Sequence, residues 1–104
     1  MKIHRATRQD VVYTLKNGKG RNLRFFRLLT SKNLEKTTVS FVVSKKVAKK
    51  AIDRNKIKRR GMSIFRQIMK NIKEDPKNYV FLANNLANKA LFNEIKDDIM
   101  NIFV

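Results

Sequence analysis

Residues 44–73 read SKKVAKKAIDRNKIKRRGMSIFRQIMKNIK, and the second half of this stretch has the period of an amphipathic α-helix. Arg59, Arg66 and Lys70 fall on its polar face, and Pro76 ends the pattern shortly afterwards. The segment therefore predicts a long helix that packs on one side and presents cations on the other. The residues that share the packed face are Ile57, Gly61, Ile64, Phe65, Ile68 and Ile72.

The first half of the stretch is a dense cationic cluster. Nine basic residues and one acid, Asp53, lie between Lys45 and Arg60. Arg54 would fall near the centre of the packed face if the helix began here, and a helix covered by a sheet does not bury a guanidinium without a partner. We therefore expect the first turns to overhang the sheet edge and to stay open to a polyanion. Asn55 adds a side chain that both donates and accepts hydrogen bonds.

Shorter patterns on either side complete the predicted order of elements. Thr7 and Asp10 have the spacing of a capping box before a helix at residues 8–16, which Gly18 would end. An apolar run at residues 79–83 is typical of a strand that is covered on both faces. The other expected elements are an edge strand within residues 19–21, strands at 22–30 and 37–44, and a closing helix at 90–103.

This order predicts an α/β fold in which helices pack on a small mixed, mainly antiparallel sheet, in the order α-β-β-β-α-β-α. A length of 104 residues suits one domain over residues 1–104. The absence of Cys excludes disulfides and thiolate metal sites, and no apolar run is long enough for a membrane-spanning helix. No secretory signal pattern follows Met1, so we expect a cytoplasmic protein.

The charge of the chain favours a polyanionic partner. The formal net charge is +17, of which residues 1–73 carry +19 and residues 74–104 carry −2. Nucleic acid is the first candidate, because each phosphate that is neutralised releases counterions. We expect no catalytic residue in the chain, since His4 is its one histidine and no nucleophile–base pattern accompanies it. We also expect neither a small-molecule substrate nor a membrane, because the basic helix lacks a broad aromatic face.

Two linked runs in the cationic cluster are Ser44-Lys45-Lys46-Val47 and Arg54-Asn55-Lys56-Ile57-Lys58-Arg59. Together they resemble the RNR motif of the bacterial ribonuclease P protein family. The likeness covers nearly the whole chain: residues 9–18 are similar to the first helix of the family and its glycine stop, 79–83 to its last strand, and 92–103 to its closing helix. A basic hexad alone is a weak signal, but between a strand-ending Ser-Lys-Lys and an amphipathic helix it is specific.

The resemblance implies that the chain is one subunit of an endoribonuclease whose catalytic RNA subunit uses bound Mg²⁺. The protein would bind that RNA and the 5′ leader of precursor tRNA, and its fold would contain a left-handed βαβ crossover, opposite to the usual hand. The contacts expected with the RNA subunit are Lys45, Lys46, Arg54, Asn55, Lys56, Lys58, Arg59 and Arg60. The residues expected in a leader cleft between the first helix and the sheet are Val11, Tyr13, Leu15 and Phe26.

Several positions depart from the family pattern. Lys56 stands where Arg is commoner and lacks its bidentate geometry. Gly61 stands where a larger residue is usual, at a cost of about 1 kcal/mol in helix propensity. Val11 and Leu15 occupy positions that often carry aromatic residues. The alternative function is that of a ribosomal or general RNA-binding protein, which would show no preference for tRNA precursors that bear a leader.

Overall fold

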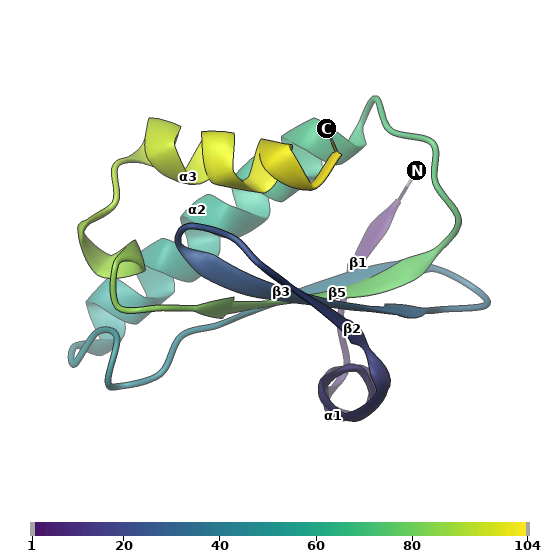
Figure 1. The fold of residues 1–104 in the computed structure, drawn as a ribbon, viewed down its shortest axis with the longest axis horizontal. Coiled ribbons are helices and arrows are strands. Elements are labelled where there is room, and N and C mark those ends of the chain that lie inside the picture. Colours follow the sequence, from purple (N-terminus) through teal and green to yellow (C-terminus); the bar gives the residue numbers. More distant parts are fainter. Residues whose placement is uncertain (1, 104) are drawn as a thin grey trace.

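The computed structural model describes residues 2–103, which form one five-stranded sheet with helices on both faces (Figure 1). The strands are β1 (Ile3–Arg5), β2 (Lys19–Asn22), β3 (Phe26–Lys32), β4 (Thr37–Val42) and β5 (Lys77–Ala83). The helices are α1 (Arg8–Asn17), α2 (Ala51–Met69) and α3 (Phe92–Met100), with 3-10 turns η1 (Ala87–Lys89) and η2 (Asn101–Phe103). The strand order across the sheet is β1-β4-β5-β3-β2.

The predicted α/β fold with a mixed sheet is confirmed. β4 pairs in parallel with both β1 and β5, whereas β3 pairs antiparallel with β5 and β2. α2 and α3 cover one face of the sheet, and α1 crosses the other face (Figure 1). α2 connects the parallel neighbours β4 and β5, and the left hand expected for this crossover stays a prediction. Within residues 2–103, no helix is both long enough and apolar enough to cross a lipid bilayer.

Most element boundaries differ from those expected by one or two residues, and larger differences occur at β1, β3 and the closing helix. β1 was missed because Ile3-His4-Arg5 is too short to show an alternating pattern, and its strand conformation comes from pairing with β4. β3 starts at Phe26 rather than at residue 22, because the preceding residues form β2 and the turn that follows it. The closing helix is α3 alone, with the 3-10 turns η1 and η2 near its two ends.

An aromatic core joins the sheet to α2. Phe41 stacks on Phe81 with 4.5 Å between ring centroids, and Phe26 meets both rings edge-on. Phe65 of α2 completes the cluster, 5.7 Å from Phe81. Such aromatic pairs contribute about 0.5–1.5 kcal/mol each beyond the area that they bury. Tyr79 lies beside Phe65, and burial together with a hydrogen bond to a glutamate raises the pKa of Tyr79 above its ordinary value.

Gly61 allows α2 to approach the sheet closely. A Cβ atom on Gly61 would lie 2.7 Å from two ring atoms of Phe41 and closer still to a third. The Phe41 ring is stacked on Phe81 and cannot swing away as the end of a flexible side chain could. The departure from the family pattern at Gly61 is therefore explained by the ring beneath it, since the ring occupies the space that a larger residue would need.

A layer of polar side chains lies between α1 and the sheet. Thr14 Oγ1 of α1 is 2.7 Å from Ser31 Oγ, which also accepts a hydrogen bond from Asn78 Nδ2 at 3.1 Å. Asn78 Oδ1 accepts from Thr38 Oγ1 at 2.6 Å and from Asn33 Nδ2 at 2.9 Å. Thr14, Thr38 and Asn78 are all buried. Directional hydrogen bonds therefore fix α1 on a face of the sheet that also carries the buried apolar residues Leu29 and Val80.

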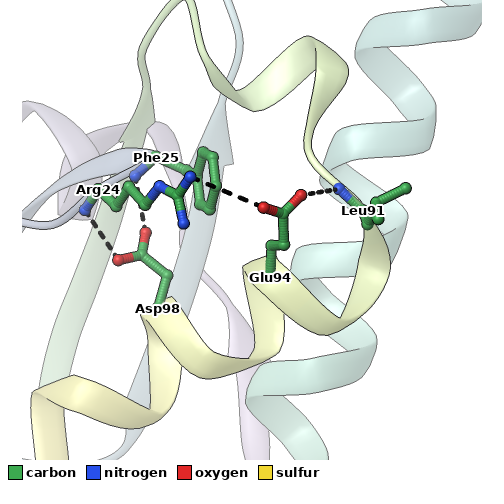
Figure 2. A network of polar contacts seen from close by, with 5 residues as sticks. All are labelled: Arg24, Phe25, Leu91, Glu94 and Asp98. Carbon is green, nitrogen blue, oxygen red and sulfur yellow. Dashed lines mark hydrogen bonds and ion pairs between the residues drawn. The ribbon is translucent and has the colours of Figure 1, made fainter.

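Asp98 ties α3 to the turn that precedes β3 (Figure 2). Its two carboxylate oxygens accept hydrogen bonds from the backbone N–H groups of Arg24 and Phe25, each at 2.8 Å. One turn earlier, Glu94 accepts from the backbone N–H of Leu91 at 2.9 Å and lies 3.7 Å from the Arg24 guanidinium. Hydrogen bonds to an ionised acceptor are stronger than neutral ones, so the Asp98 carboxylate fixes α3 to the sheet.

Replacing Gly61 by Ala should destabilise the protein, although alanine is the better helix former. The added methyl group collides with Phe41, and overpacking a core costs about 1–3 kcal/mol. This loss outweighs the gain of about 1 kcal/mol in helix propensity. Urea denaturation measures the difference, and a second substitution, Phe41→Leu, should reduce the penalty. A more stable Gly61→Ala protein would show that the ring has room to move.

Asp98→Ala should lower the free energy of unfolding by about 3 kcal/mol, because it leaves two backbone N–H groups, one buried and one part-buried, without their acceptor. The matched control is Asp97→Ala, which removes an exposed carboxylate from the same helix and should change stability by less than about 0.5 kcal/mol. Thermal or urea unfolding gives both values. Equal losses in the two variants would assign the effect to the charge of α3 instead.

Candidate nucleic-acid interface

A concave surface between α2 and the β1–β4 edge of the sheet forms a cationic groove. Its volume is about 980 Å³. Val39, Phe41 and Met62 supply apolar parts of its wall, and no Asp or Glu occurs among its lining residues within the described chain. Its cationic side chains and Asn55, called the groove residues below, are Arg5, Asn55, Lys58, Arg59, Arg66 and Lys70.

The helical repeat of α2 aligns the groove residues. Asn55, Arg59 and Arg66 are separated by four and seven positions, which places them on one face of the helix. At 1.5 Å per residue, the stripe from Asn55 to Lys70 is about 22 Å long. The described residues form two ion pairs, which involve Glu74 and Glu94. Neither pair includes a groove cation. The groove therefore concentrates positive potential along its whole length.

Three groove residues were not predicted as ligands. Arg66 and Lys70 were assigned to the polar face of the helix, and they follow Arg59 by seven and eleven positions, so the helical wheel could have included them. Arg5 gave no sequence signal, because it lies on β1, the strand that was missed. The parallel pairing of Arg5 with Val39 brings this guanidinium to the wall opposite α2.

The residues expected to contact an RNA subunit divide into two groups. Asn55, Lys58 and Arg59 line the groove. The others lie outside its lining: Lys45 and Lys46 are exposed before α2, Lys56 is exposed on α2, and Arg54 and Arg60 are half-buried there. The first buried residue of α2 is Ile57, so its first turns are open, as the sequence predicted.

Arg54 differs from the rest of this set in its contacts. Its Nη1 atom donates hydrogen bonds to the backbone carbonyls of Ala48 at 3.0 Å and Lys49 at 2.7 Å. The guanidinium that seemed misplaced on the packed face thus folds back onto the segment before the helix. Its unusual position is explained by these backbone acceptors rather than by simple exposure.

The α1 residues expected in a leader cleft lie at an accessible surface, and their role stays a prediction, whereas the prediction is wrong for Phe26, which is buried. Val11 is half-buried, and Leu15 and Tyr13 are 45% and 55% exposed. Val11 and Leu15, four positions apart, share a flank of α1, whereas Tyr13 lies on the other flank. Phe26 is 1% exposed and packs on Phe41 on the α2 face of the sheet, so it cannot line a cleft beside α1. Side chains alternate along β3, and Arg27 rather than Phe26 has the parity of the α1 face.

Comparisons with known proteins point to one family. The family model described as Ribonuclease P matches residues 4–104. A ribonuclease P protein component from Pseudanabaena sp. (strain PCC 6903) is 38% identical over 76 residues, which cover 73% of this chain. The match spans 65% of that relative, slightly less than two thirds of its length.

Solved structures share the fold. The RNase P protein from Thermotoga maritima superposes with a TM-score of 0.82 at 26% identity, over 95% of this chain and 94% of that chain. The RNase P protein from Staphylococcus aureus superposes with a TM-score of 0.83 over 99% and 94% of the two chains. At 24% identity, the second likeness concerns the fold alone.

Arg59→Ala should reduce the salt dependence of RNA binding. Loss of one phosphate contact lowers the slope of log K against log salt concentration by about one. Lys96→Ala is the matched control, because it removes one charge from an exposed position of α3 outside the groove. Titrations of labelled RNA at several KCl concentrations give both slopes. An unaltered slope for Arg59→Ala would show that this guanidinium does not contact phosphate.

Proposed function

Because the chain belongs to the ribonuclease P protein family, we propose that it is the protein subunit of a bacterial ribonuclease P. In this role it binds the catalytic RNA and the 5′ leader of precursor tRNA and promotes the endonucleolytic cut that forms the mature tRNA 5′ end. The observation that carries the proposal is the acid-free cationic groove along α2, which the RNR-like segment helps to line.

The groove suits the sugar-phosphate backbone of the RNA subunit. Its guanidinium groups bind phosphate oxygens in pairs, whereas Lys58 and Lys70 act as point charges. Each phosphate that the groove neutralises releases condensed counterions, which drives binding without sequence preference. Asn55 adds a donor and an acceptor, which can bond a 2′-hydroxyl or an unpaired base edge. Lys45 and Lys46 extend the cationic surface beyond the N-terminal end of α2.

The opposite face of the sheet suits the leader. α1 presents Val11 and Leu15 on one flank, and Val42 of β4 is 38% exposed on the same side of the sheet. Unpaired bases stack or pack on such side chains, although aliphatic residues give less than the roughly 1–3 kcal/mol per base of an aromatic platform. The two RNA ligands thus occupy different faces, and the sheet and its cations separate the two polyanions.

Catalysis in this proposal belongs to the RNA subunit, which holds the Mg²⁺ ions. The protein contributes by lowering the repulsion between ribozyme and substrate, so that fewer free cations are needed to bring them together. The work would take place in the cytoplasm, with no membrane and no small-molecule substrate involved.

Reconstitution with a bacterial ribonuclease P RNA tests this function. Added protein should lower the Mg²⁺ concentration at which the RNA removes a tRNA leader. The double variant Lys58→Ala/Arg59→Ala should lose most of this effect. Lys89→Ala/Lys96→Ala removes the same charge from exposed positions outside the groove and should retain the effect.

Three outcomes would contradict the proposal. No stimulation at low Mg²⁺ would reject a role as the ribozyme's subunit. Leader removal by the protein without RNA would indicate a nuclease. Co-sedimentation with ribosomal particles, without preference for tRNA precursors that bear a leader, would favour the ribosomal or general RNA-binding alternative.

A further inference from the structure

The segment that connects β4 to α2 displays lysines without forming regular structure. Residues 43–50 leave β4 and enter α2, and four exposed lysines occur in this loop. These loop lysines are Lys45, Lys46, Lys49 and Lys50. Where their charges stand relative to the groove depends on the shape of the loop backbone.

The loop backbone is held at few points. The carbonyl of Ser44 accepts hydrogen bonds from the N–H groups of Val47 at 3.1 Å and Ala48 at 3.2 Å, which forms a turn. The methyl group of Ala48 is 2% exposed and belongs to the hydrophobic core. Lys50, the N-cap of α2, makes no capping hydrogen bond with its side chain. The start of α2 therefore lacks the side-chain capping of N–H groups that Thr7 and Asp10 provide at α1.

Arg54 supplies a side-chain contact of another kind, to the carbonyls of this loop. Its Nη1 atom, which carries two hydrogens, donates to the carbonyls of both Ala48 and Lys49. Among residues 2–103, no other side chain donates a hydrogen bond to the loop backbone. A cation in the first turns of a helix is disfavoured by the helix dipole, so the two carbonyl oxygens also offset the charge at this position.

We propose that Arg54 is a positioning residue, which shapes the loop so that the loop lysines meet RNA phosphates, and is not itself a phosphate ligand. The inference rests on the proposed function, since it concerns how the same RNA is held. Lysine side chains are long and mobile, and fixing the backbone that carries them reduces the entropy lost on binding. Without Arg54, the loop lysines would keep their charge but lose their placement.

A double-mutant cycle separates positioning from direct contact. Binding of the ribonuclease P RNA is measured at low ionic strength for the parent, for Arg54→Ala, for a variant with all four loop lysines replaced by Ala, and for the combination. Arg54→Ala should weaken binding about tenfold in the parent, which corresponds to about 1.4 kcal/mol. In the loop variant it should weaken binding less than about twofold, because residues that act together are not additive.

The matched control is Lys56→Ala, which removes one exposed charge two positions away and makes no hydrogen bond to the loop. Its effect should be the same in both backgrounds. If Arg54→Ala weakened binding by the same factor in the parent and in the loop variant, Arg54 would contact RNA directly, and the proposal would be overturned.

Amide hydrogen exchange of the free protein provides a readout that needs no RNA. Exchange at Val47 and Ala48 should accelerate several-fold in Arg54→Ala and stay at the parent rate in Lys56→Ala. Unaltered exchange in Arg54→Ala would show that Arg54 does not hold the loop backbone, and would refute the proposal. If the parent failed to bind the RNA, the proposed function would fall, and exchange would still decide whether Arg54 holds the loop.

Discussion

The close contact between Gly61 of α2 and the Phe41 ring of β4 is the constraint on which the rest of the structure depends. The contact sets the distance between α2 and the sheet. Because α2 and the β1–β4 edge form the two walls of the cationic groove, this distance also sets the width of the groove. The same contact brings Phe65 onto Phe81 and completes the aromatic core. A bulkier residue at position 61 would lift α2 and widen the groove as well as weaken the core, so stability and binding geometry are coupled at one glycine.

The positive and the negative side chains of the protein have different tasks and lie on different elements. The cations that define the groove come from β1 and α2, whereas α3 contributes acids that fasten the structure. Asp98 is used internally, on backbone N–H groups, and leaves the positive field of the groove unopposed. The groove therefore stays strongly positive, because the two acids of α3 that fasten the structure, Asp98 and Glu94, lie away from it.

The sequence predicted best what depends on periodicity and worst what depends on backbone partners. The stripe of Ile57, Gly61, Ile64 and Phe65 located α2, and the glycine stop located the end of α1. β1 could not be recognised from three residues, since its conformation is imposed by β4. Phe26 was placed on the wrong face, because Phe25 and Phe26 are adjacent and either parity fitted the pattern. The contacts of Arg54 and Asp98 run to main-chain groups, which leave no trace in the amino-acid pattern.

The polar seat beneath α1 has a mechanical consequence. A purely apolar interface lets a helix rotate about its axis, because one methyl contact can replace another at little cost. The hydrogen bonds among Thr14, Ser31 and Asn78, in contrast, have fixed directions. A rotation of α1 about its own axis would break them and strand polar atoms away from water. The hydrogen bonds thus fix the rotational orientation of α1. The flank that carries Val11 and Leu15 therefore faces the same direction before a ligand binds.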